Sequence, residues 1–172
     1  MTSPSLASAG ATTWTRTATG DEDEGASDLA ILLVDRAGNS TPRTFPDVVT
    51  FDFTAPAQPR AMVLATPIRP GAQARVRLTF DEPPAPESVR LSLERTGSAA
   101  IPLDLVETAG TTLEFAAALP SGAHDGNWDI VLDSFTDLAG NAGTPATLEA
   151  LEVDGTPPAF AGTATFDRTP PL

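Results

Sequence analysis

Two short motifs in this sequence carry side chains that could hold a metal ion. Each is an Asp-x-Ala-Gly-Asn segment, Asp35–Asn39 or Asp137–Asn141, and each is followed by a further aspartate. Ca²⁺ is bound in proteins by about six to eight oxygens from carboxylates, amides, backbone carbonyls and water. One interpretation is therefore a calcium site at a junction between modules. Its candidate ligands are Asp35, Asn39, Asp52, Asp137, Asn141 and Asp154.

The same motifs have a second interpretation, in which they only shape a turn. An aspartate side chain can accept hydrogen bonds from backbone N–H groups two residues on, and a Gly-Asn pair tolerates the left-handed backbone region. The sequence supplies few carboxylates for each site and nothing like the dense Asp-x-Asp-x-Asp of an EF-hand loop. We therefore favour the turn and keep calcium as the alternative.

The spacing of the motifs indicates an internal repeat. Asp35 and Asp52 lie 17 residues apart (52 − 35), and Asp137 and Asp154 also lie 17 apart (154 − 137). The two motif copies are 102 residues apart (137 − 35), about the length of one small β-sandwich. We predict one complete module over residues 57–156, the C-terminal half of another over 1–56, and the start of a further module over 157–172.

The complete module shows the period-2 alternation of half-buried strands. Seven short strands are expected, which is the number that a two-sheet sandwich needs. Residues 1–54 offer three more, at Thr12–Thr19, Leu29–Val34 and Val48–Phe53, but no facing sheet, so we expect this part to be poorly ordered by itself. The seven strands are expected within Arg60–Ala65, Gln73–Phe80, Ser88–Glu94, Ile101–Leu105, Leu113–Ala117, Trp128–Leu132 and Ala146–Val153.

The motif pair and its period resemble the tandem immunoglobulin-like repeats of bacterial surface proteins and large adhesins. The resemblance implies an all-β fold, with immunoglobulin-like β-sandwich modules of about seven strands in tandem. In that family the repeats are mostly stalks that hold another domain away from the cell surface, and some bind Ca²⁺ between modules. The Asp-x-Thr-x-Pro segment that closes the last strand belongs to the same pattern.

The resemblance leads to two functional hypotheses. The first is a non-catalytic structural or adhesive spacer of a secreted or surface-anchored bacterial protein, located outside the cell or on its surface. Its partners would be the neighbouring modules of the same chain, with extracellular proteins or glycans as further candidates. The alternative is a ligand- or carbohydrate-binding accessory module of a larger secreted protein or hydrolase.

Composition argues against several other classes of function. The net charge is −13, from 23 acidic and 10 basic residues, and such a surface repels phosphate backbones and anionic lipids. Nucleic-acid binding is therefore not expected. There is no cysteine, which excludes disulfides and thiolate metal sites, and no apolar run long enough to predict membrane insertion.

An enzyme is not expected either. The single histidine, His124, falls in a Gly-rich turn, and no nucleophile elbow or phosphate-binding loop is present. The two tryptophans could suggest sugar stacking, but Trp128 falls at the inward phase of its predicted strand, and we interpret it as a core residue. We also favour a packing role for Trp14.

Overall fold

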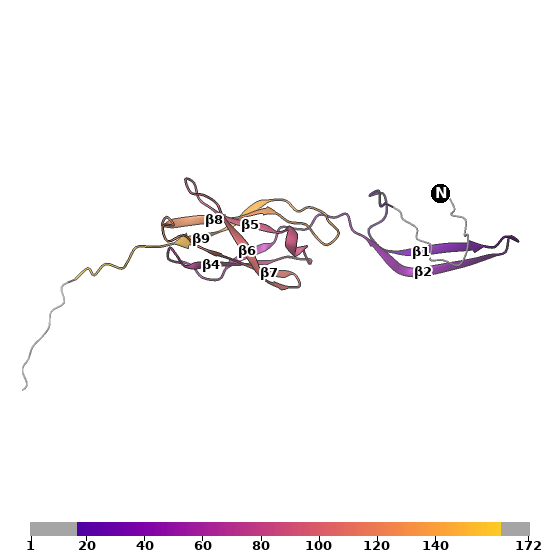
Figure 1. The fold of residues 1–172 in the computed structure, drawn as a ribbon, viewed down its shortest axis with the longest axis horizontal. Coiled ribbons are helices and arrows are strands. Elements are labelled where there is room, and N and C mark those ends of the chain that lie inside the picture. Colours follow the sequence, from indigo (N-terminus) through magenta and orange to yellow (C-terminus); the bar gives the residue numbers. More distant parts are fainter. Residues whose placement is uncertain (1–16, 163–172) are drawn as a thin grey trace, which may run out of the picture. The chain divides into compact units, whose positions relative to one another are not determined.

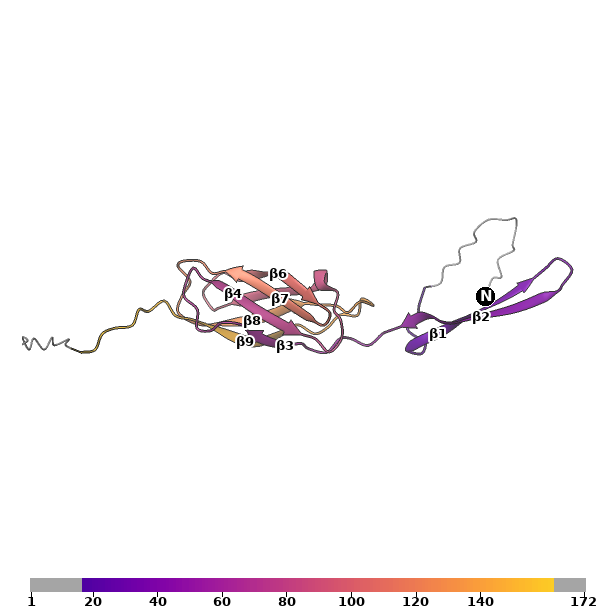
Figure 2. The same ribbon diagram turned by 90° about the horizontal axis from the view of Figure 1, so that it is seen from below.

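The computed structural model describes residues 17–162, and it divides the chain into two units with the boundary between Thr54 and Ala55. Unit 1 contains β1 (Gly25–Val34) and β2 (Ser40–Phe51). Unit 2 contains β3 (Arg60–Val63), β4 (Gln73–Thr79), a short 3₁₀ helix η1 (Pro86–Ser88), β5 (Arg90–Glu94), β6 (Ile101–Ala109), β7 (Thr112–Ala118), β8 (Gly126–Ser134) and β9 (Ala146–Val153). Figure 1 labels the strands of both units except β3, which is labelled in Figure 2.

Unit 2 is a β-sandwich with the strand order of an immunoglobulin-like domain. The hydrogen-bonded order is β3-β4-β7-β6-β5-β8-β9. The first half of β6 pairs with β5 and its second half pairs with β7, so β6 connects a β3-β4-β7-β6 sheet to a β5-β8-β9 sheet. Figure 2 shows β4, β6 and β7 side by side. The all-β, immunoglobulin-like fold predicted from the sequence is confirmed, and so are its seven strands.

The core of unit 2 follows from the alternation of the sequence. Val76 and Leu78 on β4 belong to the same hydrophobic core as Leu132 on β8, and all three side chains are fully buried. Trp128 is 2% exposed, as the inward phase of its strand predicted, and its indole N–H donates to the backbone carbonyl of His124. The His124 side chain is exposed in its turn, as expected. The sandwich therefore has a continuous apolar core and, without cysteine, no disulfide across it.

The first and last segments of unit 2 lie beside each other in parallel. After β3, the chain changes sheets and Ile68 forms a parallel bridge with Val153 on β9. The Ile68 N–H donates to the Glu152 carbonyl at 2.9 Å, and the Asp154 N–H donates to the Ile68 carbonyl at 2.9 Å. The two ends of the module are thus bonded directly to each other.

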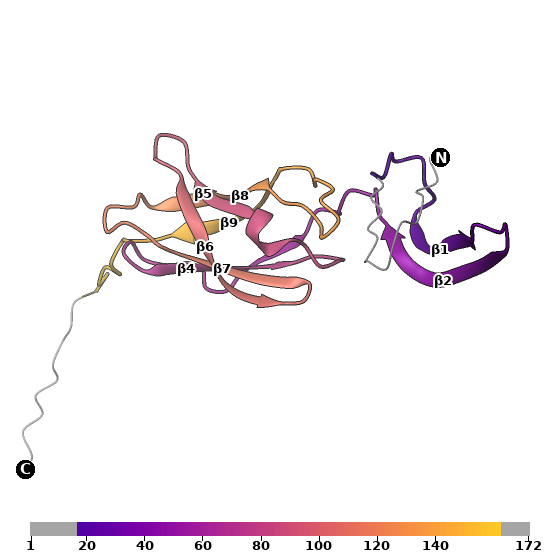
Figure 3. The ribbon, with the colours of Figure 1, turned by 45° about the vertical axis from the view of Figure 1, so that its right-hand side comes forward.

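Unit 1 is an antiparallel hairpin of β1 and β2, both labelled in Figure 3. The predicted strand Leu29–Val34 is confirmed within β1. The second strand starts earlier than predicted, at Ser40, and runs through Pro42 and Pro46 before it ends at Phe51. The remaining predicted strand of unit 1 is Thr12–Thr19. Its residues 17–19 are not β-structure, and residues 12–16, Trp14 among them, lie outside the residues that the structure describes.

Most large apolar side chains of the hairpin are exposed to solvent. Leu32 is 63% exposed and Val34 54%, whereas the core side chains of unit 2 are buried. Consecutive strand residues point to opposite sides, so the run Leu32-Leu33-Val34 makes both sides of the hairpin apolar near its turn. The exposed set is Leu29, Leu32, Leu33, Val34, Phe45, Val48, Val49 and Phe53.

Candidate functional site

The Asp-x-Ala-Gly-Asn motif of unit 2 forms a tight turn after β8 that is organised by one carboxylate. Asp137 is 2% exposed, and its Oδ1 accepts hydrogen bonds from the backbone N–H groups of Gly140 at 2.7 Å and Asn141 at 2.9 Å. Its Oδ2 accepts from the Asn141 amide at 2.8 Å. Gly140 has a φ of 97°, a conformation that favours glycine. Both carboxylate oxygens are therefore used by the turn itself.

The motif of unit 1 makes the same kind of turn. The Oδ1 of Asp35 accepts from the N–H groups of Ala37 at 2.8 Å and Asn39 at 2.9 Å, and its Oδ2 accepts from the Asn39 amide at 2.8 Å. Gly38 has a φ of 90°. All five residues of this turn are exposed, whereas in unit 2 Asp137 is buried and the middle of its turn is exposed. The aspartate-bonded turn predicted from the motif is thus present in both units.

The two turn carboxylates favour their ionised forms. The pKa of Asp35 is lowered by the side-chain hydrogen bond from Asn39 and by backbone N–H groups of the turn. For Asp137, burial raises the pKa, but the hydrogen bonds from Asn141, Gly140 and Ala139 together outweigh it, so that the pKa is lowered. Each aspartate is consequently held as an anion by its own turn.

A second carboxylate in unit 2 fixes the direction in which the chain leaves the module. Asp125, directly before β8, accepts from the N–H of Gly155 at 2.8 Å and from the hydroxyl of Thr156 at 2.9 Å. Asp154 accepts from the N–H of Thr156 at 2.8 Å. We call this group of residues the exit clamp of unit 2. Gly155 is needed here because a Cβ would lie 2.9 Å from the Asp125 carboxylate and 3.1 Å from Pro70.

Unit 1 has an exit clamp of the same design. Glu24, directly before β1, accepts from the N–H of Phe53 at 2.8 Å and from the hydroxyl of Thr54 at 2.7 Å, while Asp52 accepts from the N–H of Thr54 at 3.2 Å. The hydrogen bond from the Thr54 hydroxyl is the main cause of the lowered pKa of Glu24. Gly25 follows Glu24 with a φ of 106°, and Gly126 follows Asp125 with a φ of 107°.

From the sequence alone, the acidic stretches that contain Glu24 and Asp125 could compete as calcium sites, but a solvated loop and a turn before a strand are the favoured interpretations, and neither residue is predicted to form a clamp. Both lie in acidic stretches that resemble ordinary solvated loops, and each reaches a partner about thirty positions away. The signal that could have found them is the acid-Gly pair before an alternating strand, which occurs once before each motif copy, as Glu24-Gly25 and Asp125-Gly126.

The predicted calcium ligands of a unit do not all come together. Asp137 and Asn141 share one turn, and so do Asp35 and Asn39. Asp154, however, follows Val153 of β9, which pairs with Gly126 at the start of β8. The Asp137 turn follows the other end of β8. A nine-residue strand is roughly 30 Å long, so Asp154 is far from Asp137 within unit 2.

Asp52 is placed in the same way at the far end of the β1–β2 hairpin from Asp35, because Phe51 pairs with Gly25. Calcium binding at these positions stays a prediction.

Comparison with known proteins yields a likeness of fold only. No protein-family model matches the sequence, and no curated protein matches it. The filamin domain of Lin-41 aligns with a TM-score of 0.38 and 10% identity, over 60% of this chain and all of that domain. The Bacteroides ovatus mixed-linkage glucan utilization locus protein SGBP-B, solved in complex with a mixed-linkage heptasaccharide, aligns with a TM-score of 0.33 and 25% identity. That alignment covers 76% of this chain and 30% of SGBP-B. At these TM-scores neither likeness bears on function.

Across residues 17–162, no helix is both long enough and apolar enough to cross a bilayer.

Proposed function

We propose that this chain is a non-catalytic mechanical spacer, built from immunoglobulin-like modules in tandem, of a secreted or surface-anchored protein. The observation that carries the proposal is the parallel pairing of the two ends of unit 2, where Ile68 is bonded to Glu152 and Asp154. The exit clamp adds the bonds of Asp125 to the same end of β9.

The geometry of this pairing determines how the module responds to tension. Two parallel strands run in the same direction, so a force on the chain before Ile68 and after Asp154 pulls them in opposite directions along their axes. The two backbone hydrogen bonds of Ile68 are then strained together instead of one after another. Forced unfolding depends on the height of the unfolding barrier, which such an arrangement raises. A module held this way suits a function in which length must be kept under load.

The tandem arrangement is supported by features that the two units share. Each has an aspartate turn, after β1 in unit 1 and after β8 in unit 2. Each also has a carboxylate that accepts a hydrogen bond from the threonine beyond the following strand, Thr54 after β2 or Thr156 after β9. A clamp that fixes the exit direction of a chain is useful where another module follows. Extracellular or surface location and contact with neighbouring modules form part of the same proposal.

The proposal can be tested by pulling the full chain between handles at its two termini. Unit 2 is expected to unfold in a single event with a gain of about 30 nm, since roughly ninety residues lie between the bonded ends. Ile68→Pro removes the N–H that donates to Glu152 and is expected to lower the unfolding force. Ile68→Ala is the matched control, because it also loses the side chain but keeps the N–H. Equal unfolding forces for the two variants would contradict the mechanical role.

A further inference from the structure

A buried carboxylate lies on the outer side of the β3-β4-β7-β6 sheet, where exposed side chains are the rule. Glu114 on β7 points away from the core side chains Leu113 and Phe115, yet its side chain is only 7% exposed. It is covered by Arg75 and Arg77, which extend from β4 and remain 48% and 42% exposed. A buried charge is tolerated only when it is paired, so this group is a built ionic cluster.

The contacts hold both guanidinium groups against the sheet. Arg77 is directly opposite Glu114 in the β4–β7 ladder, and its Nη2 donates to Oε2 at 3.2 Å. The Nη2 of Arg75 forms an ion pair with Oε1, without a hydrogen bond of good geometry. Only one nitrogen of each arginine contacts Glu114 in these pairs. A guanidinium carries five N–H donors, so the solvent-facing donors of both arginines are available to a ligand.

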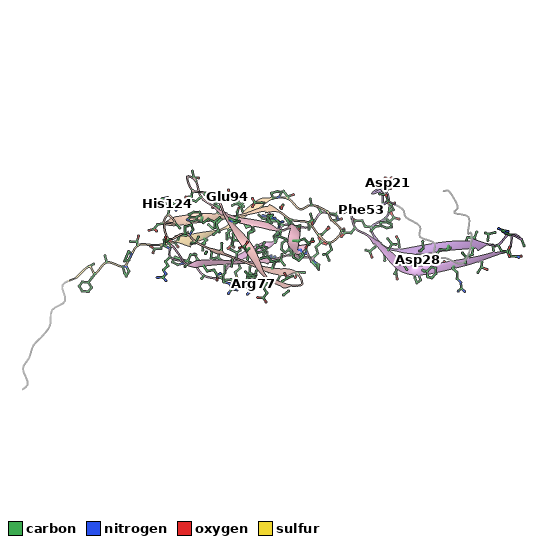
Figure 4. All side chains as sticks on the ribbon, in the orientation of Figure 1. Asp21, Asp28, Phe53, Arg77, Glu94 and His124 are labelled. Atoms are coloured by element: carbon green, nitrogen blue, oxygen red, sulfur yellow. The ribbon has the colours of Figure 1, made fainter. Side chains whose placement is uncertain are left out.

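The charge of this face differs from that of the rest of the unit. Arg60 and the two cluster arginines are balanced by Asp104, Glu107 and Glu114, which gives 0 (3 − 3) on a chain of −13. On the opposite sheet, β5, β8 and β9 expose one arginine and five acids, which gives −4 (1 − 5). Figure 4 shows Arg77 and Glu94 on opposite sides of unit 2. The residues of the opposite sheet are Arg90, Glu94, Asp129, Asp133, Glu149 and Glu152.

A depression of about 500 Å³ adjoins the cluster. Long side chains, Arg77 and Glu107 among them, form one row across the sheet, and the next row has the short side chains Thr79, Thr112 and Ala109. Its volume falls within the range of small-ligand sites. The lining offers two hydroxyls, a guanidinium and the carboxylates of Glu107 and Glu114, a set of donors and acceptors that matches the hydroxyl groups of a sugar ring.

We propose that this face binds an acidic polysaccharide. Arg75 and Arg77 hold a carboxylate or sulfate group of the ligand, Glu114 positions the two arginines, and the depression takes the hydroxyls of an adjoining sugar. Planar guanidinium groups bind such anions through two parallel hydrogen bonds, which gives direction as well as charge. The depression lacks the large apolar anchor pocket of a protein interface, and this favours a polysaccharide over an acidic protein.

The test is calorimetric titration of the full chain at low salt with uronate oligomers, sulfated oligosaccharides, a neutral oligosaccharide and poly-glutamate. The expected result is binding of one or both acidic saccharides that weakens as salt is added, with no binding of the neutral one. Which acidic saccharide binds distinguishes a carboxylate from a sulfate. Poly-glutamate binding as tightly as the saccharides would overturn the proposal, and so would the absence of acidic saccharide binding.

The variants separate a shaped site from a simple charge effect. The triple variant Arg75→Gln/Arg77→Gln/Glu114→Gln removes the whole cluster without leaving a buried charge, and we expect it to weaken binding by about tenfold or more. Arg75→Lys/Arg77→Lys keeps the charge but loses the planar fork, and should also weaken binding. Arg90→Gln, on the opposite sheet, is the control and should bind as the wild type does. Unchanged binding by the folded triple variant refutes the site, and it leaves the pulling experiment on Ile68 unaffected.

Discussion

Replacing Asp137 by alanine should strongly destabilise unit 2, because one carboxylate organises the whole turn after β8. The change removes three hydrogen bonds, from the Gly140 N–H, the Asn141 N–H and the Asn141 amide. Hydrogen bonds to a charged group contribute about 1.5–3 kcal/mol each, but water reaches the exposed Gly140 and replaces part of the loss. We therefore expect a loss of about 3 kcal/mol. For a module of this size that corresponds to a fall in Tm of roughly 10–20 °C.

The assay is urea denaturation of the full chain followed by tryptophan fluorescence. A Trp14→Phe background leaves Trp128, in the core of unit 2, as the only reporter. Asp35→Ala is the matched control, since it removes the equivalent carboxylate from unit 1 and should leave the Trp128 transition unchanged. A loss below about 0.5 kcal/mol for Asp137→Ala would refute the reasoning, because a substitution away from any structural role has an effect of that size.

The pH dependence of the same variant provides an independent check. The pKa of Asp137 is lower in the folded chain than in the unfolded chain. The stability that its carboxylate gives to unit 2 is therefore complete when the pH is above the pKa of an unfolded aspartate, about 3.9. It is lost as the pH falls through the folded pKa, when the carboxylate becomes protonated in both states. Wild-type unit 2 should therefore lose stability in acid more steeply than Asp137→Ala. Parallel pH profiles would contradict the assigned hydrogen bonds.

Two further predictions concern unit 2 and the calcium hypothesis. Gly143→Ala should destabilise unit 2 by about 1–3 kcal/mol, because the new Cβ would lie 2.0 Å from Cζ of the buried Phe135 ring; Gly122→Ala, with nothing within 4 Å of its Cβ, is the control. Equal denaturation midpoints for the two variants would contradict this packing. If calcium binds at these motifs, excess Ca²⁺ should raise the Tm of the full chain by several degrees over a chelator-treated sample, as expected for a ligand of the native state. Superimposable melts would remove calcium from the interpretation and leave the turns as they are.

The strands of unit 2 could be predicted from the sequence because one face of each is buried. Alternation places Val76 and Leu78 inward and Arg75 and Arg77 outward, and the sandwich needs both. The aspartate turns could be predicted for a similar reason, since all their hydrogen bonds connect residues at most four positions apart.

The long-range polar contacts could not be predicted in this way. Glu114 sits at an outward position of an alternating strand, so the sequence pattern assigns it to solvent, and only the lengths of two arginines on the neighbouring strand explain its burial. Asp125 meets Thr156 only because β8 and β9 pair in one particular register. Periodicity indicates which side of a strand faces the core, but it does not reveal which polar groups meet on the other side.

The two prolines of β2 have a consequence for how this protein behaves in concentrated solution. Within the described residues β2 pairs only with β1, and the hairpin exposes apolar side chains such as Leu32 and Phe45. An uncovered apolar strand invites other chains to add to its edge and form fibres. Pro42 and Pro46 have no N–H to donate to an added strand, and Asp47, with a φ of 52°, interrupts the extended conformation beside them. The β2 edge of the hairpin therefore carries its own protection against the addition of another strand.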